Sequence, residues 1–177
     1  MQSTIKWRRK MRRLRVALAL AVAAFISFGC AGLGGAAGAK SAPEFKVELL
    51  TGEEVTLAKF AGKPLVLNIG ASWCPHCLRE MPAFREVYED NKDGVAFLMV
   101  FVKSPRKEVD GLVKKQGLSF KVGYDEEAVI GKAYGVKGIP HTFFIGPDGK
   151  VVDDYIGSID KDELAEKVSA LLKGPKK

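Results

Sequence analysis

The feature that most constrains the fold is a nearly uninterrupted apolar run at residues 65–69, which has the length of a strand. A strand that is apolar on both faces must be covered on both faces, so this run predicts the centre of a sheet between two layers. Residues 95–102 repeat the pattern. Between the two runs, apolar residues at spacings of three and four predict a helix over 74–91, which Pro82 should kink.

The remaining segments continue this alternation of strands and helices. The turn at 51–52 and the turn at 146–149 each predict a hairpin, Ser104 marks the start of a helix, and Ser158 or Asp160 is expected to cap the last one. We expect further strands at 45–50, 54–57, 120–124, 141–145 and 151–156, and further helices at 105–116, at 126–134 and in the segment that ends at Gly174. This order predicts an α/β sandwich in which helices flank a mixed central sheet, with an N-terminal β-hairpin.

The formal net charge of +7 comes entirely from the first 39 residues. They hold seven basic side chains and no acidic one, whereas 21 basic and 21 acidic residues balance from Lys40 onward. The neutral body lacks a basic stripe interleaved with aromatic residues, the usual footprint of a nucleic-acid-binding protein. We therefore expect no nucleic-acid partner.

The N-terminal basic cluster is followed by an apolar run at 16–28 and then by small residues. This three-part layout is typical of a secretory signal and should not be interpreted as part of the fold. We therefore divide the chain into an export or anchoring segment, residues 1–39, and one folded domain, residues 40–177. The domain is expected to be periplasmic or otherwise extracytoplasmic.

Three fates of the N-terminal segment stay open. Cleavage after Ala39 would release the domain. Lipidation at Cys30 would tether it, since Cys30 ends a stretch resembling a bacterial lipoprotein box, although Ser27 stands where Leu is usual. Retention as an uncleaved anchor is the third fate, because residues 16–39 carry no charge and are long enough to span a bilayer.

Cys74 and Cys77 are three positions apart at the start of the expected helix, so they lie on one helical face and can form a disulfide. The unpaired N–H groups and the positive end of the helix dipole stabilise the Cys74 thiolate, which predicts that Cys74 is the nucleophile. Cys77 is then placed to resolve a mixed disulfide. Pro75 stiffens the turn, and a protonated His76 would favour the thiolate further, as in the oxidising DsbA proteins with the same Cys-Pro-His-Cys sequence.

A Cys-x-x-Cys pair can also be half of a zinc site. Tetrahedral zinc needs four ligands, and outside the pair the body offers only His76, inside the motif, and the distant His141. We therefore expect no metal.

These motifs together strongly resemble the TlpA/ResA branch of the thioredoxin superfamily, over residues 43 to about 172. The resemblance rests on Trp73-Cys74-Pro75-His76-Cys77, Leu65-Val66-Leu67-Asn68, Glu80-Met81-Pro82, Leu57, Phe60, Gly62-Lys63-Pro64, Gly138-Ile139-Pro140 and Thr142-Phe143-Phe144-Ile145. It implies a thioredoxin-like sandwich.

The resemblance also implies roles for residues near the cysteines. Pro140 should have a cis peptide bond and lie beside the disulfide, where the backbone of Ile139 pairs with an extended substrate segment. Trp73 should shield and contact the site. His141 either touches substrate or lies on the surface.

Two polar residues are candidates for redox tuning. Asn68 stands where thioredoxins proper carry a buried Asp that helps to deprotonate the inner cysteine, and Asn cannot titrate. Glu80, one helical turn beyond Cys77, either takes over that role or is a solvated helix charge.

The function implied by the resemblance is thiol–disulfide exchange with protein cysteines, with no organic cofactor, by a protein expected to be monomeric. The favoured direction is reduction, for example of apocytochrome c, with a membrane redox partner as electron donor. A disulfide-forming oxidant is the rival, supported by His76. A peroxidase of the peroxiredoxin type is a weaker rival, because the Pro-x-x-x-Thr/Ser-x-x-Cys loop is absent. A binding module that retains only the groove is the non-enzymatic alternative.

Overall fold

The central sheet has seven strands in the order β2-β1-β5-β4-β3-β6-β7, and a computed structural model describes it within residues 40–174. The strands are β1 (Lys46–Leu49), β2 (Glu54–Thr56), β3 (Leu65–Gly70), β4 (Ala96–Val102), β5 (Lys121–Asp125), β6 (His141–Ile145) and β7 (Val151–Ile156). The helical elements are the 3-10 helix η1 (Leu57–Phe60) and the helices α2 (Pro75–Asn91), α3 (Arg106–Gln116), α4 (Val129–Ala133) and α5 (Lys161–Lys173). Strands β3, β4 and β5 are parallel and the other pairs antiparallel, so the predicted mixed sheet is confirmed.

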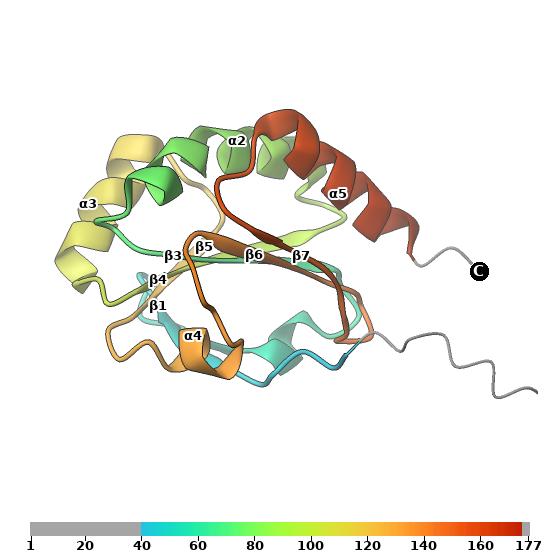
Figure 1. Ribbon diagram of the computed structural model, residues 1–177, viewed down its shortest axis with the longest axis horizontal. Coiled ribbons are helices and arrows are strands. Elements are labelled where there is room, and N and C mark those ends of the chain that lie inside the picture. Colours follow the sequence, from blue (N-terminus) through green and yellow to red (C-terminus); the bar gives the residue numbers. More distant parts are fainter. Residues whose placement is uncertain (1–39, 175–177) are drawn as a thin grey trace, which may run out of the picture. The chain divides into compact units, whose positions relative to one another are not determined.

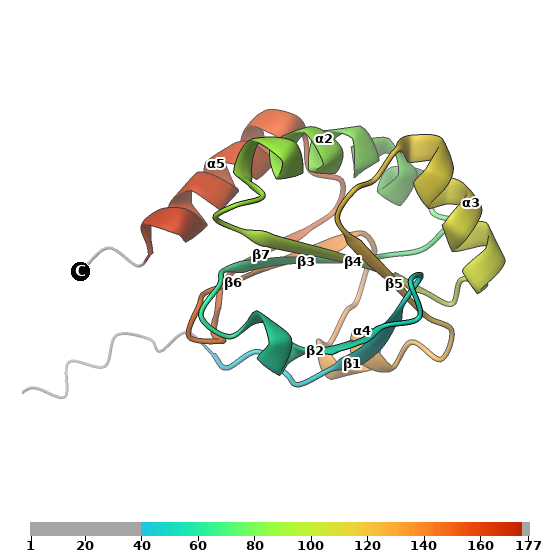
Figure 2. The ribbon, with the colours of Figure 1, turned by 180° about the vertical axis from the view of Figure 1, so that it is seen from behind.

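Helical elements cover both faces of this sheet. In Figure 1, α2, α3 and α5 lie on one side, and η1 and α4 lie on the other; Figure 2 shows the same layers from behind. Every residue of β3 is buried, with Leu67 in the cluster on the α4 side and Val66 in the cluster under α2. The continuous apolar run thus predicted the central position of β3 correctly.

Of two residues expected to cap helices, one does so and the other does not. Asp160 caps α5, since its Oδ1 accepts a hydrogen bond from the Glu163 N–H at 2.9 Å. The prediction for Ser104 is wrong: α3 begins at Arg106, and Pro105 occupies the capping position without a side-chain bond. The reason is that Ser104 has other partners, donating to the carbonyl of Val102 and accepting from Ser72 N–H, both at 2.9 Å.

The expectations for residues 1–39, including lipidation at Cys30, lie outside the described residues. Within residues 40–174, none of the helices has the length and apolar character needed to cross a membrane. Pro82 lies inside α2, which continues to Asn91, and its kink stays a prediction.

The strands bring two distinct sets of residues to the two ends of the sheet. At one end, which we call the Cys74 end, β3 finishes, β6 begins and β7 finishes, as the pairings Ile69↔His141 and His141↔Ile156 require. At the other, the entry end, the described chain begins, and the Ala42 N–H donates to the carbonyl of Gly149 in the β6–β7 turn at 2.9 Å.

Candidate functional site

Cys74 is the N-terminal cap of α2, directly after the loop that leaves β3. Pro75 suits the first helical position because its missing N–H has no intrahelical partner there. Cys74 and Cys77 form a disulfide with their Cα atoms 5.3 Å apart, and the Cys77 N–H donates to Cys74 Sγ at 3.3 Å. A backbone donor of this kind favours a charged sulfur when the bond is reduced.

The segment before β6 lies against the outer sulfur. The Ile139–Pro140 peptide bond is cis, which confirms the expectation from the sequence. Cys74 Sγ is 3.9 Å from the carbonyl oxygen of Ile139, and the Ile139 side chain packs on the two cysteines and Ala71. The fold thus brings the Ile139 backbone beside the sulfur expected to react.

Trp73 belongs to the rim of this site and not to the core, because 60% of it is exposed. Its indole N–H donates to the carbonyl of Lys103, just after β4, at 3.1 Å. Ser72 is anchored on the same side through its N–H to Ser104. The loop before Cys74 is therefore tied to the segment that follows β4.

Glu80 lies one turn beyond Cys77 on the face of α2 that packs on the sheet, and it is 1% exposed. The alternative of a solvated helix charge is therefore wrong. Its Oε1 accepts from Asn68 Nδ2 at 2.8 Å and its Oε2 from the Ile159 N–H at 3.1 Å. Burial raises the pKa of Glu80 to about 7, and the hydrogen bonds from Ile159 and Asn68 oppose that rise.

Asn68 and Thr142 complete this buried polar group. They are directly opposite each other in β3 and β6, and Asn68 Nδ2 donates its second hydrogen bond to Thr142 Oγ1 at 3.0 Å. Thr142 is fully buried. The sequence analysis did not single it out as a site residue, although a polar residue directly before the apolar run 143–145 was a usable signal.

Gly70 allows the inner sulfur to approach the sheet. A Cβ at this position would lie 3.2 Å from both Cβ and Sγ of Cys77, and 3.7 Å from Asn68 Oδ1. A larger residue would therefore push Cys77 away from β3.

His141 is buried, at 5% exposure, so the alternative of a surface position is wrong. Its ring points to the same face of β6 as Phe143, and the two ring centroids are 4.0 Å apart. Nε2 is 2.8 Å from Asp154 Oδ2, and Nδ1 has no partner among the described residues. Contact of His141 with substrate stays a prediction.

Ile156 is a rim residue that the sequence analysis assigned only to a strand. It is 58% exposed at the end of edge strand β7. A Cβ on Gly138 would lie 3.7 Å from Ile156 Cγ2, and the next N–H, of Gly157, donates to the carbonyl of Pro140 at 2.8 Å. Ile156 therefore flanks the cis-proline segment on the side of β7, whereas Trp73 flanks Cys74 on the side of β4.

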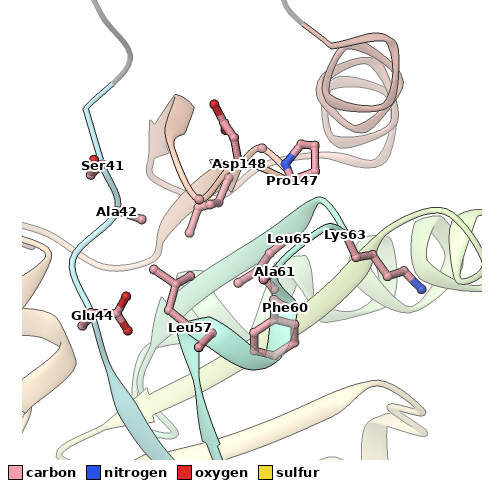
Figure 3. A pocket seen from close by; sticks show the side chains of 14 residues that line it. Ser41, Ala42, Glu44, Leu57, Phe60, Ala61, Lys63, Leu65, Pro147 and Asp148 are labelled. Carbon is pink, nitrogen blue, oxygen red and sulfur yellow. The ribbon is translucent and has the colours of Figure 1, made fainter.

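A separate pocket of about 340 Å³ lies at the entry end, between η1, the start of the described chain and the β6–β7 turn (Figure 3). Its lining includes Glu44, Phe60, Lys63 and Asp148, and neither cysteine of the site. Among the described residues, no group of three or more His, Cys, Asp or Glu side chains could hold a metal ion.

Comparison with known proteins agrees with this geometry. Residues 36–171 match the Redoxin family. The chain is 34% identical over 132 residues to the thiol-disulfide oxidoreductase ResA of Geobacillus thermodenitrificans, covering 74% of this chain and 76% of the relative. It is 37% identical over 128 residues to ResA of Bacillus thuringiensis subsp. konkukian, covering 72% and 74%.

Solved structures give the same result. A thiol:disulfide interchange protein of the thioredoxin family from Chlorobium tepidum superposes with a TM-score of 0.70 at 25% identity, covering 76% of this chain and 97% of that one. A secreted disulfide oxidoreductase of Mycobacterium tuberculosis, described as homologous to E. coli DsbE, gives 0.64 at 29% identity, covering 71% and 94%. The chain therefore belongs to the Redoxin family, within the TlpA/ResA branch of the thioredoxin superfamily, and is a thiol–disulfide oxidoreductase.

Proposed function

We propose that this protein is an extracytoplasmic dithiol reductant of protein disulfides, with Cys74 as the nucleophile and Cys77 as the resolving thiol. The observation that carries the proposal is the cap geometry: Cys74 Sγ accepts the Cys77 N–H and lies beside the Ile139 backbone. Both cysteines are buried in the disulfide form, Cys74 at 5% and Cys77 at 2% exposure. The sulfur at the cap, beside Ile139, is therefore assigned to meet substrate, and the sulfur one turn along the helix to resolve.

The reaction has two exchange steps. The Cys74 thiolate attacks a substrate disulfide, a new S–S bond forms, and one substrate sulfur leaves as a thiolate that takes a proton from water. The Cys77 thiolate then attacks Cys74 Sγ, forms the Cys74–Cys77 disulfide and releases the second substrate sulfur. The protein loses two electrons and the substrate gains them.

Glu80 is proposed as the base that takes the proton of Cys77. A carboxyl whose pKa is about 7 can accept a proton and release it near neutral pH, which suits general base catalysis. Asn68 cannot titrate, so Glu80 fills the place of the buried acid of thioredoxins proper.

The proposed direction of electron flow follows the resemblance to the TlpA/ResA branch, which implies a reductant, and the similarity to the ResA relatives. His76, which supports the rival oxidant, is exposed, and Arg79 Nη2 lies at hydrogen-bond distance from its Nδ1.

Substrate is proposed to lie as an extended segment across Ile139 and Pro140. Trp73 and Ile156 would contact its apolar side chains on either side of the reacting cysteine. His141, which the sequence analysis also assigned to substrate binding, is proposed to orient the start of β6 through its buried ring.

The N-terminal segment supports placement outside the cytoplasm, by cleavage, by lipidation at Cys30 or by an uncleaved anchor. A reductant in an oxidising compartment must be recharged. We therefore propose a membrane electron donor as redox partner, and a monomeric working state.

The test is the equilibrium of the purified domain with glutathione, together with insulin-disulfide reduction. A reduction potential well below that of DsbA, which is about −120 mV, would support reduction. A potential near that value would overturn the proposed direction and favour the oxidant. Trapping mixed disulfides with Cys77→Ala in the native cell would then identify the substrates.

A further inference from the structure

The Asn68 amide contacts the Glu80 carboxyl, and its oxygen lies near Gly70, which the inner sulfur also approaches. Its Nδ2 donates one hydrogen bond to Glu80 Oε1 and the other to Thr142 Oγ1. Its Oδ1 is 3.7 Å from the position of a Cβ on Gly70, and Cys77 Sγ is 3.2 Å from that same position. The amide therefore presents one donor to Glu80 and one to Thr142, while its oxygen lies on the Gly70 side, which Cys77 Sγ also approaches.

A side-chain amide offers two donors on nitrogen and two acceptor sites on oxygen in nearly the same directions. A half-turn about the Cβ–Cγ bond of Asn68 therefore exchanges the two patterns without moving the backbone. With nitrogen toward Glu80, the pattern favours an ionised carboxylate, which only accepts. With oxygen toward Glu80, the pattern needs a protonated carboxyl and a Thr142 hydroxyl that donates to the amide oxygen. In the first orientation the Thr142 oxygen accepts from Asn68, so its own proton is not used by Asn68.

We propose that Asn68, with Thr142 as its partner, is a positioning residue that reverses its amide when a proton passes from Cys77 to Glu80. This inference rests on the proposed function. In the step, the S–H bond of Cys77 breaks, an O–H bond forms on Glu80, and no electrons are exchanged. The reversed amide donates to the Cys77 thiolate until it attacks Cys74, and Glu80 later gives its proton to water.

The groups that contact the Glu80 carboxyl are neutral. Glu80 contacts Asn68 on β3 and the Ile159 N–H before α5, and Asn68 contacts Thr142 on β6. Cys77 lies one turn before Glu80 on α2. Of these only Cys77 titrates, and no charged side chain is among the causes of the raised pKa of Glu80. The hydrogen-bond pattern of Asn68 is therefore the feature that can respond to the proton.

Thr142→Val and Thr142→Ser provide the test, read from the titration midpoint of the Glu80 carboxyl carbon by NMR in the reduced protein. In Thr142→Val, one Asn68 N–H has no acceptor when Glu80 is ionised. The free-energy cost of this unsatisfied buried donor in the ionised state should raise the proton affinity of Glu80 about tenfold, which is a shift of the titration midpoint of about one pH unit. Thr142→Ser restores the hydroxyl and should restore the wild-type midpoint.

Asn68→Leu tests the kinetic part, read from the rate at which Cys77 resolves a Cys74–glutathione mixed disulfide. Loss of the donor to the thiolate should slow this step about tenfold at neutral pH. Alkylation of Cys74 by iodoacetamide should keep its rate, because Cys74 depends on the Cys77 N–H.

An unchanged Glu80 midpoint in Thr142→Val would overturn the inference, even if the variant were less stable, since a structural role alone lowers stability without moving the titration. If Asn68→Leu does not fold, the two Thr142 variants decide. The proposed function fails in a different way: the wild-type protein would then not resolve the mixed disulfide.

Discussion

The two ends of the sheet differ most clearly in their carboxyl groups. At the Cys74 end, Glu80 is buried without a cation, and burial raises its pKa to about 7. At the entry end, Asp148 lines the pocket of Figure 3, and its hydrogen bond to Lys150 lowers its pKa. A carboxyl group is thus present at both ends, but among these two only Glu80 has a pKa that allows proton exchange near neutral pH, and it lies one helical turn from Cys77.

Removal of the reacting sulfur should have the largest effect. Cys74→Ser should lower the rate of insulin-disulfide reduction at least about a thousandfold, because a neutral hydroxyl cannot replace a thiolate in disulfide exchange. Asp148→Asn at the entry end should leave the rate within about twofold. Residual activity of Cys74→Ser above that limit would remove the functional contrast between the two ends.

Glu80→Gln should change how stability depends on pH. In the folded state the pKa of Glu80 is about 7, against an ordinary value of 4.5, so the folded protein holds this proton more tightly. Its contribution to stability is therefore greatest below pH 4.5, declines between pH 4.5 and 7, and is lost above pH 7, by about 3 kcal/mol in total. Urea unfolding of the oxidised protein should show that Glu80→Gln lacks this decline.

Asp148→Asn is the matched control for that experiment. A lowered pKa contributes stability that is present at neutral pH and lost in acid, which is the opposite sign. If Glu80→Gln and Asp148→Asn gave the same pH dependence, the assignment of a raised pKa to Glu80 would be wrong.

Gly70→Ala should have a moderate effect on the packing at the Cys74 end. The new Cβ would crowd Cys77 Cβ and Sγ at 3.2 Å, and overpacking of this kind costs about 1–3 kcal/mol. Disulfide formation should slow in parallel. Gly111→Ala, in the middle of α3 with open space around it, should instead stabilise by about 0.5–1 kcal/mol. Thermal unfolding of both variants measures the difference.

Ile156→Ser should have the smallest effect. Ile156 and Val152 are both exposed apolar residues of β7, at opposite ends of the strand. Loss of one apolar contact should reduce the preference for an apolar over a polar peptide disulfide about threefold to fivefold in Ile156→Ser. In Val152→Ser it should not change, and equal changes in both variants would place the substrate groove elsewhere.

Local patterns were enough to predict most of the fold. The apolar run of β3, the helical spacing of α2 and the turn at 146–149 depend on residues close in the chain, and all three are confirmed. Ser104 shows where local patterns fail, because a residue caps a helix only if its side chain bonds to a helix N–H and not to another partner. Ser72, 32 positions earlier, takes the place that a helix N–H would have had.

The surroundings of single side chains could not be predicted in the same way. The sequence analysis left an exposed alternative for both Glu80 and His141, because the neighbours of each in the sequence fit a buried as well as an exposed side chain. Both are buried, Glu80 because its helical face packs on β3, and His141 because β6 directs it to the same side as Phe143.

By itself, the sequence determined the pair Cys74 and Cys77 and its place at a helix start, because these depend on spacing within a local motif, and the resemblance to a known family implied the cis peptide bond at Pro140. Only the tertiary structure decided that Asn68, Glu80, Thr142 and the Ile159 N–H meet beneath the inner sulfur. Thr142 is 74 positions from Asn68, and Ile159 is 79 positions from Glu80. Contacts over such distances arise from the pairing of β3 with β6 and the packing of α2 on the sheet, which a pattern of neighbouring residues does not encode.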